Sequence, residues 1–149
     1  MKMRVVENGI GDWFQRSIAK SEGSSVRGWL NRVAYPEIIN AQLRRWQSEG
    51  ASEGEKWQAL NPAYARSKLK RFADYPGGGR KMLIATGRLV DSMTGRSEEG
   101  RKIVQETKLT IVSTVPYGEY VDEVRDITSL SEKTVDRLID SLIAYLVGA

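Results

Sequence analysis

The sequence contains no histidine and no cysteine among its 149 residues. Without cysteine there are no disulfides and no thiolate metal sites, a composition typical of a protein that folds in a reducing cytoplasm. Without histidine, the Ser–His–Asp triads, the Cys–His pairs and the HExxH zinc motif are excluded. An enzyme built on this chain would depend on carboxylate or Ser/Lys chemistry.

Acidic residues are the remaining candidates for catalysis, because two carboxylates can act as acid and base in the manner of a glycosidase. The candidates are Glu53, Glu55, Asp122, Glu123 and Asp126. Side chains of this kind usually form a solvated rim, and nothing in their spacing favours catalysis over that role. The sequence therefore predicts a protein that is not an enzyme, with no catalytic residue, cofactor or metal.

Long hydrophobic runs are also missing. The first residues lack the continuous apolar core of a secretory signal. The most apolar stretch, residues 135–147, carries Asp136, Arg137 and Asp140 and is shorter than the roughly twenty residues that cross a bilayer. We therefore expect no membrane partner.

The sequence does contain enough apolar material for one core, since 40% of its residues are hydrophobic. At this length a single domain is the natural count, and we place it at residues 26–149. Residues 1–25 are less regular and are predicted to form an N-terminal arm. Within the arm, Val5 and Val6 favour a short strand, residues 12–20 a short helix and residues 22–25 a flexible joint.

Apolar periodicity predicts a long helix in the N-terminal half. Its apolar residues are Val26, Trp29, Leu30, Val33, Ile38, Ile39, Leu43 and Trp46. Pro36 lies inside this segment and has no backbone donor, so we expect the helix to be disturbed there. Gly50 is predicted to close it.

A core helix at the C-terminus is the clearest structural prediction. Its apolar residues follow a three-then-four rhythm and are Val135, Leu138, Ile139, Leu142, Ile143 and Leu146. Ser131 can accept a hydrogen bond from an unpaired amide of the first turn, and Gly148 follows the last turn. This amphipathic helix is expected to bury its apolar face in the core.

Another helix is predicted to begin near Pro62. Asn61 can cap it, and Pro62 lacks only an N–H that the first turn leaves unpaired. Just upstream, Trp57 and Leu60 are the large apolar groups of a Gly- and Glu-rich stretch. We expect both to fold back over the core, with Trp57 buried against this helix. The glycine-rich residues 75–81 that follow predict a mobile surface loop.

A short helix and a hairpin are predicted next. Thr86 is the candidate N-cap of the helix and Gly95 its stop. The apolar face of this helix consists of Leu89, Val90 and Met93. Alternating apolar residues predict a strand over residues 109–115, ended by Pro116, with an earlier strand over residues 103–107 as its partner. The fold class is therefore α+β, a small antiparallel sheet packed against the two long helices.

The charge balance is modestly basic, with 23 Lys and Arg against 19 Asp and Glu. The cluster that could contact DNA phosphates or a partner consists of Arg66, Lys68, Lys70, Arg71, Arg80 and Lys81. No helix-turn-helix signature accompanies it, and the glycines at 77–79 lack the GxxxxGK[ST] spacing of a phosphate-binding loop. A sequence-specific DNA binder is disfavoured, whereas a protein beside which DNA passes is compatible.

Three segments occur in an order that resembles a known family: GEKWQALNPAYARSK, ATGRLVDSM and VPYGEYV. They resemble the tail completion, or virion morphogenesis, family of tailed bacteriophages over residues 26–147. The residues that carry the match are Glu53, Gly54, Trp57, Leu60, Tyr64, Lys68, Leu83, Thr86, Gly87, Leu89, Pro116, Tyr117 and Arg125. Gly118 stands where the family favours alanine, and the family's His and Gly after the tyrosine are absent here.

The resemblance implies a virion protein that assembles with itself into a ring, expected to be a hexamer, at the head-proximal end of the tail. Assembly would take place in the host cytoplasm. Such a ring stops polymerisation of the tail tube and offers a surface to the head–tail connector proteins, so the tail tube protein and the connector are implied partners. Two alternatives stay open: a connector or neck protein on the portal side, and a small DNA-binding accessory protein.

Overall fold

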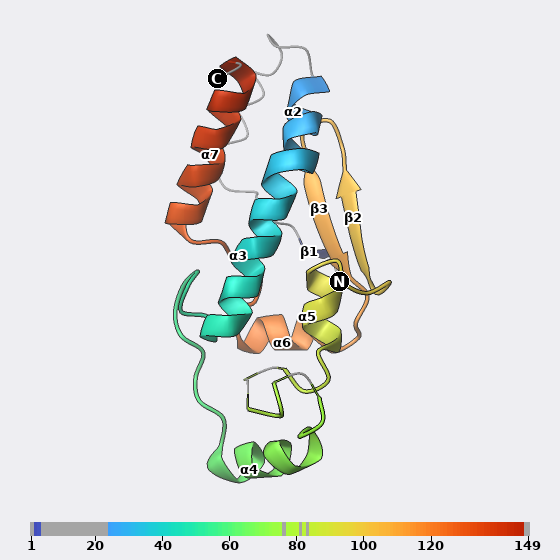
Figure 1. Ribbon diagram of the computed structural model, residues 1–149, viewed down its shortest axis with the longest axis vertical. Helices are drawn as coiled ribbons and strands as arrows, with labels where there is room; N and C mark the ends of the chain where they lie inside the picture. Colours follow the sequence, from blue (N-terminus) through green and yellow to red (C-terminus); the bar gives the residue numbers. More distant parts are fainter. Residues whose placement is uncertain (1, 4–23, 76, 81, 83, 148–149) are drawn as a thin grey trace.

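The computed structural model describes residues 2–3, 24–75, 77–80, 82 and 84–147. It has the α+β architecture expected from the sequence, in which helices pack against a small antiparallel sheet (Figure 1). The sheet contains β1 (Lys2–Met3), β2 (Gly100–Val104) and β3 (Leu109–Ser113). β3 lies between the other two strands and pairs antiparallel with both. The predicted fold class is therefore confirmed.

The N-terminal-half helix is continuous but irregular. It consists of α2 (Ser24–Trp29), a π-helical turn, η1 (Leu30–Ala34), and α3 (Tyr35–Ser48). The wide turn lies directly before Pro36: the Tyr35 amide donates to the Leu30 carbonyl, five residues back. Because Pro36 has no amide hydrogen, the helical ladder must be interrupted at this point, as predicted.

The ends of this helix differ partly from expectation. α2 already begins at Ser24, so the flexible joint predicted for residues 22–25 is wrong for Ser24 and Ser25. α3 ends at Ser48, after which Glu49 and Gly50 both adopt positive φ angles, 54° and 97°. The Gly50 amide donates to the Arg45 carbonyl at 2.9 Å, which closes the helix as predicted.

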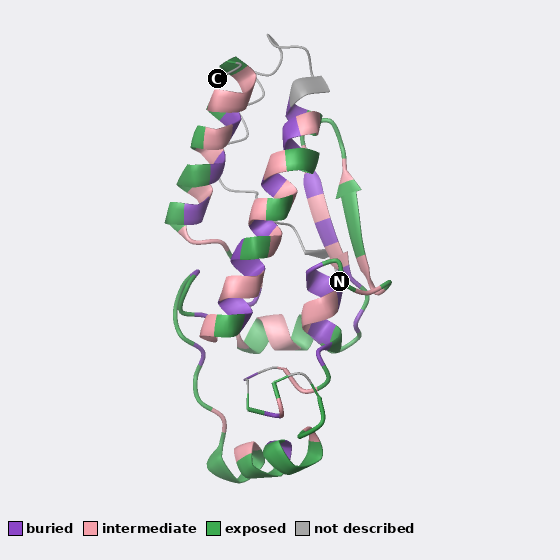
Figure 2. Ribbon diagram, viewed as in Figure 1, coloured by how far each residue is buried: buried purple, intermediate pink, exposed green. Residues whose placement is uncertain are grey.

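Helix α7 (Glu132–Val147) packs beside α2 and α3 and shares a core with them and the sheet (Figure 2). The buried members of this core are Val26, Trp29, Leu30, Ala34, Ile38, Leu109, Ile111, Leu138 and Leu142. The predicted cap is present, since the Thr134 amide donates to the Ser131 hydroxyl at 3.2 Å. The sheet thus packs against both long helices, as the sequence predicted.

The predicted hairpin is present with shifted bounds. The first strand spans residues 100–104 rather than 103–107, because the chain turns where the Gln105 amide donates to the Lys108 carbonyl at 2.8 Å. β3 ends at Ser113 rather than Val115, because the Thr114 amide turns away from the ladder and donates to the Glu99 carbonyl. Within β3 the predicted alternation is confirmed, with Leu109, Ile111 and Ser113 buried.

Three shorter helices build the other end of the molecule: α4 (Pro62–Arg71), α5 (Arg88–Met93) and α6 (Gly118–Val124). Asn61 caps α4 as predicted, because its side-chain oxygen accepts from the Ala63 amide at 2.9 Å. The cap of α5 falls at Gly87, with φ 85°, rather than at Thr86, whose hydroxyl accepts from the Arg88 amide at 3.4 Å. Helix α6 was not predicted.

A second core joins α5 and α6 to the end of α3 and contains no residue of α4. Its buried members are Trp46, Trp57, Met82, Leu89, Met93, Val115 and Ile127. We call α4 and the turns after it, residues 61–75 and 77–80, the α4 segment. Figure 1 shows this segment at the end of the molecule remote from the C-terminal end of α7.

Parts of the predicted N-terminal arm lie outside the described residues. These include the strand at Val5 and Val6 and the helix over residues 12–20. What the structure does place is β1, where Lys2 and Met3 pair with Val112 and Ile111 of β3. No helix within the described ranges is long and apolar enough to span a membrane.

Candidate functional site

A pocket of about 200 Å³ opens between α4, the start of α5 and the turn before α6. Its lining residues are Leu60, Tyr64, Lys68, Ala85, Thr86, Gly87, Arg88, Leu89 and Tyr117. Most of the residues on which the family resemblance rests are among them, although they come from three separate segments of the chain. The structure therefore brings the three segments together at one place.

The local fold explains this convergence. Tyr64 and Lys68 are one turn apart on α4 and so lie on the same face. Thr86 and Gly87 form the entrance to α5, and the φ of 85° at Gly87 is one that side-chain-bearing residues rarely adopt. Tyr117 follows β3 and immediately precedes α6. Each of the three segments thus contributes a helix face or a helix start to the lining of the pocket.

Lys68 is the only residue of α4 that is buried, with 2% of its surface exposed. Burial lowers the pKa of its ammonium group, and the nearby charge of Glu49 only partly opposes this. Glu49 itself accepts a hydrogen bond from the Met82 amide at 3.0 Å. The prediction that Lys68 belongs to a surface cluster for DNA is therefore wrong.

The glycine turns after α4 close over Lys68. Gly79 has φ 70° and is buried, and a Cβ atom at this position would lie 2.5 Å from the Lys68 carbonyl oxygen. The chain reaches it through two tight turns, in which the amides of Gly78 and Arg80 donate to Tyr75 and Gly77. Only glycine combines that backbone angle with that close approach.

Arg88 is a pocket residue that sequence reasoning missed. It forms a bidentate ion pair with Glu99, with Nε 2.8 Å from Oε2, and this contact raises the pKa of Arg88 and lowers that of Glu99. No sequence pattern indicates an ion pair between these two residues, which are eleven positions apart. With Arg88 bound to Glu99 and Lys68 beside Glu49, the pocket offers aromatic and aliphatic walls for packing rather than an open anion site.

The residues of the resemblance that do not line the pocket are Glu53, Gly54, Trp57, Pro116 and Arg125, together with Leu83, which lies outside the described residues. Trp57 is buried as predicted, but its ring meets Trp46 of α3 edge to face at 5.3 Å between centroids, and its Nε1 donates to the Asp126 carbonyl at 3.0 Å. These contacts place it against α3, not against α4 as expected. Arg125 donates to the Gln58 carbonyl at 3.3 Å, and Pro116 is exposed.

The remaining cations of the predicted contact cluster are exposed on the α4 segment. They are Arg66, Lys70, Arg71 and Arg80, whereas Lys81 lies outside the described residues. The Arg71 guanidinium lies over the rings of Tyr64 and Phe72, at 5.9 and 5.7 Å from their centroids. On α4 itself, Arg66 and Lys70 are two further exposed cations, one helical turn apart.

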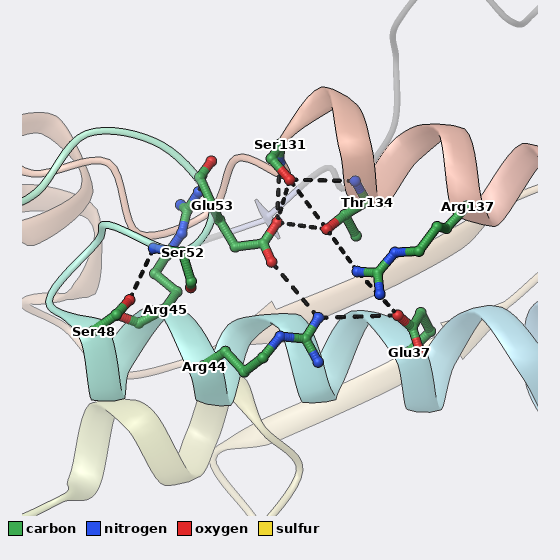
Figure 3. A network of polar contacts seen from close by, with 9 residues as sticks. All are labelled: Glu37, Arg44, Arg45, Ser48, Ser52, Glu53, Ser131, Thr134 and Arg137. Atoms are coloured by element: carbon green, nitrogen blue, oxygen red, sulfur yellow. Dashed lines mark hydrogen bonds and ion pairs between the residues drawn. The ribbon is translucent and has the colours of Figure 1, made fainter.

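A buried polar network ties α3 to α7 and was not foreseen (Figure 3). The Glu53 carboxylate accepts from the Ser131 amide at 3.1 Å and from the hydroxyls of Ser131 and Thr134 at 3.0 and 2.8 Å. Arg44 lies 3.7 Å from its other oxygen. Burial alone would raise the pKa of Glu53, but these hydrogen bonds and the charge of Arg44 together lower it.

The network extends outward and along α3. Glu37 lies between two guanidinium groups, 3.9 Å from Arg44 and 3.4 Å from Arg137. Arg45, with only 1% of its surface exposed, donates to the Glu53 carbonyl at 3.2 Å and to the Asp126 carboxylate at 3.1 Å. One buried arginine and one buried glutamate therefore fix the 50–57 loop, residue 126 and the start of α7 relative to one another.

Of the five carboxylates considered for catalysis, Glu53, Asp122 and Asp126 have structural partners, whereas Glu55 and Glu123 are exposed. Glu53 is buried, so the expected solvated rim is wrong for this residue. Asp122 accepts from the Ile127 amide at 3.1 Å, and Asp126 accepts from the amides of Thr128 and Ser129. Burial opposes ionisation of Asp126, but the bonds to Ser129 and Thr128 and the Arg45 charge outweigh it and lower the pKa.

Among the described residues, no group of three or more acidic side chains is placed to hold a metal ion. Comparison with protein-family models, curated proteins and solved structures finds no match for this chain. What the pocket and the network do is therefore inferred from their own geometry and from the family resemblance of their residues.

Proposed function

We propose that this chain is a structural subunit of a bacteriophage virion that forms a ring at the head-proximal end of the tail. The ring would terminate the tail tube and join it to the head. The observation that carries the proposal is the pocket, because residues that the resemblance assigns to three separate blocks line one cavity.

The surface of the chain supports a role in assembly. Large apolar side chains are exposed on several elements, including Ile103 on β2, Tyr120 and Val124 on α6, and Ile143 and Val147 on α7. β2 is also an edge strand of the described sheet, with one side open to further pairing. A subunit whose neighbours cover such groups fits a ring, which forms when a head-to-tail contact repeats until its rotation closes.

The buried polar groups support a role without catalytic turnover. Three of the five carboxylates that could act as acid and base, Glu53, Asp122 and Asp126, are held by backbone amides, hydroxyls or guanidinium groups of the same chain. A carboxylate that is fully engaged in this way positions loops and helices. The proposed activity is accordingly assembly with copies of itself, with the tail tube protein and with connector proteins.

The test is complementation in phage production that lacks this protein, followed by electron microscopy. The proposal predicts full heads and separate tails that fail to join, with tails of irregular length, and normal particles when the protein is supplied. Normal joining and normal tail length without the protein would overturn it. Heads that leak DNA beside tails of normal length would instead favour a connector on the portal side.

A further inference from the structure

The outer face of α7 carries a stripe with two halves. Its members are Glu132, Asp136, Asp140, Ile143 and Val147, all of them exposed. At 3.6 residues per turn these positions fall within roughly 80° of arc. The first half is acidic and the second apolar, with 46% of Ile143 and 74% of Val147 exposed. Within the described ranges, none of the three carboxylates forms an ion pair.

The outer face of α4 carries a stripe of the opposite charge. Pro62, Arg66, Leu69 and Lys70 are exposed and fall within roughly 100° of arc. Leu69 is 42% exposed and lies beside the two cations on this face. Neither cation forms an ion pair with a described residue. This face is opposite the one that buries Lys68.

The two stripes match in spacing as well as in sign. Arg66 and Lys70 are four residues apart on one helix, and Asp136 and Asp140 are four residues apart on the other, a rise of about 6 Å in each case. Each charged pair has an exposed apolar residue beside it, Leu69 on α4 and Ile143 on α7. The apolar component distinguishes this pairing from a DNA contact, which needs only charge and reach.

We propose that the α4 stripe docks on the α7 stripe of a second copy of this chain. Figure 1 shows α4 and α7 in different parts of the molecule, so the two stripes of one copy face different neighbours. The contact is therefore head to tail, and its repetition generates a ring or a filament according to whether the rotation closes. The inference rests on the proposed function and names the surfaces that would close the ring.

Charge reversal tests the contact directly, with native mass spectrometry of the purified full chain as the measurement. One variant carries Arg66→Glu and Lys70→Glu, and the other carries Asp136→Lys and Asp140→Lys. Each variant alone places like charges across the contact, and we expect its dissociation constant to rise on the order of 100-fold. A 1:1 mixture of the two restores opposite charges at every contact. We expect the mixture to form oligomers in which the variants alternate.

The quadruple variant, with both stripes reversed, should assemble by itself. A control with Arg32→Glu and Arg96→Glu makes the same charge change at exposed positions outside both stripes, and should assemble like the wild type. Circular dichroism of each variant verifies that it is folded.

Three outcomes would overturn the inference. If both double variants still form oligomers of the same size and stability as the wild type, this contact is excluded and the ring proposal stays intact. Loss of binding to duplex DNA in the Arg66/Lys70 variant, with unchanged assembly, would assign the stripe to DNA. A wild-type chain that stays monomeric alone and is absent from assembled tails would contradict the contact and the proposed function together.

Discussion

The body around α3 and α7 and the α4 segment are held in different ways. In the body, apolar side chains from the long helices and β3 form one buried cluster, and Glu53 and Arg45 connect loops and helices across it. The α4 segment buries one residue of its helix, a lysine, and depends on an asparagine cap and on glycine turns. Figure 2 shows the contrast, with buried residues along α3 and exposed residues along α4.

The two regions are therefore expected to differ in local stability and in their part in assembly. Local stability follows the number of buried apolar contacts, and segments with few such contacts open first. The body can fix the position of the α7 stripe without help from a neighbour, whereas the α4 segment gains contacts when another protein covers it. The basic stripe of α4 and the acidic stripe of α7 provide the charge complementarity that the proposed head-to-tail contact uses.

The largest loss of stability is expected on removal of Trp57, because this residue joins the 50–57 loop to α3. Trp57→Ala should lower the free energy of unfolding by about 3–5 kcal/mol, the usual cost of emptying a buried aromatic site. Chemical denaturation followed by circular dichroism measures it. Tyr120→Ala, at a residue 68% exposed, should change stability by less than about 0.5 kcal/mol. An unchanged midpoint for the Trp57 variant would remove Trp57 from the core.

Glu53→Gln should weaken the body by about 1–3 kcal/mol. The amide keeps one acceptor for the hydroxyls of Ser131 and Thr134 but loses the charge that faces Arg44. Glu55→Gln is the matched control, because Glu55 is exposed and only two residues away. Equal denaturation midpoints for the two variants would mean that the network adds nothing to stability.

Gly79→Ala should destabilise the α4 segment and leave the body around α3 and α7 unchanged. The new Cβ would meet the Lys68 carbonyl oxygen at 2.5 Å from a backbone with φ 70°, and we expect a cost of about 1–3 kcal/mol. Amide exchange should then become faster in α4 and stay unchanged in α7. Gly54→Ala is the control, since its Cβ would have no neighbour within 4 Å. Equal acceleration in α7 would show that the two regions unfold as one unit.

The smallest expected effect is a gradual loss of stability in acid. The pKa values of Glu53 and Asp126 are lowered from 4.5 and 3.8 in the folded protein, so the unfolded chain binds protons first as the pH falls. The stability that these carboxylates add is present above their ordinary pKa values and is lost as the pH falls through the lowered ones. Glu53→Gln should flatten this dependence between pH 7 and pH 2. Wild-type stability that rises over the same range would contradict it.

Much of the fold could be predicted from local patterns. The rhythm of α7, the alternation in β3 and the Asn61-Pro62 start of α4 each depend on residues close in sequence, and the structure has all three. Strand ends were less accurate, because the turn at residues 105–108 and the bond from Thr114 to Glu99 decide them. α6 was missed because its seven residues are too few for a helical periodicity of apolar residues to stand out.

The polar network and the partners inside the pocket could not be predicted, for a physical reason. Glu53 bonds to residues about eighty positions away, and Arg45 to Asp126 across a similar distance. Charged residues are rarely buried unless they are paired, so a lone glutamate in a glycine-rich loop indicates a solvated side chain. Seven of the nine residues that line the pocket carry the family resemblance, but neither the pocket itself nor the Arg88–Glu99 pair was predicted.

Amide hydrogen exchange of the free chain, compared with the chain on assembled tails, tests the central claim most directly. The account predicts slow exchange in α7 and β3 in both states. It predicts fast exchange in the α4 segment of the free chain and strong protection of that segment once the chain is on the tail. An α4 segment that exchanges as slowly as α7 in the free chain, or that gains no protection on tails, would contradict the account.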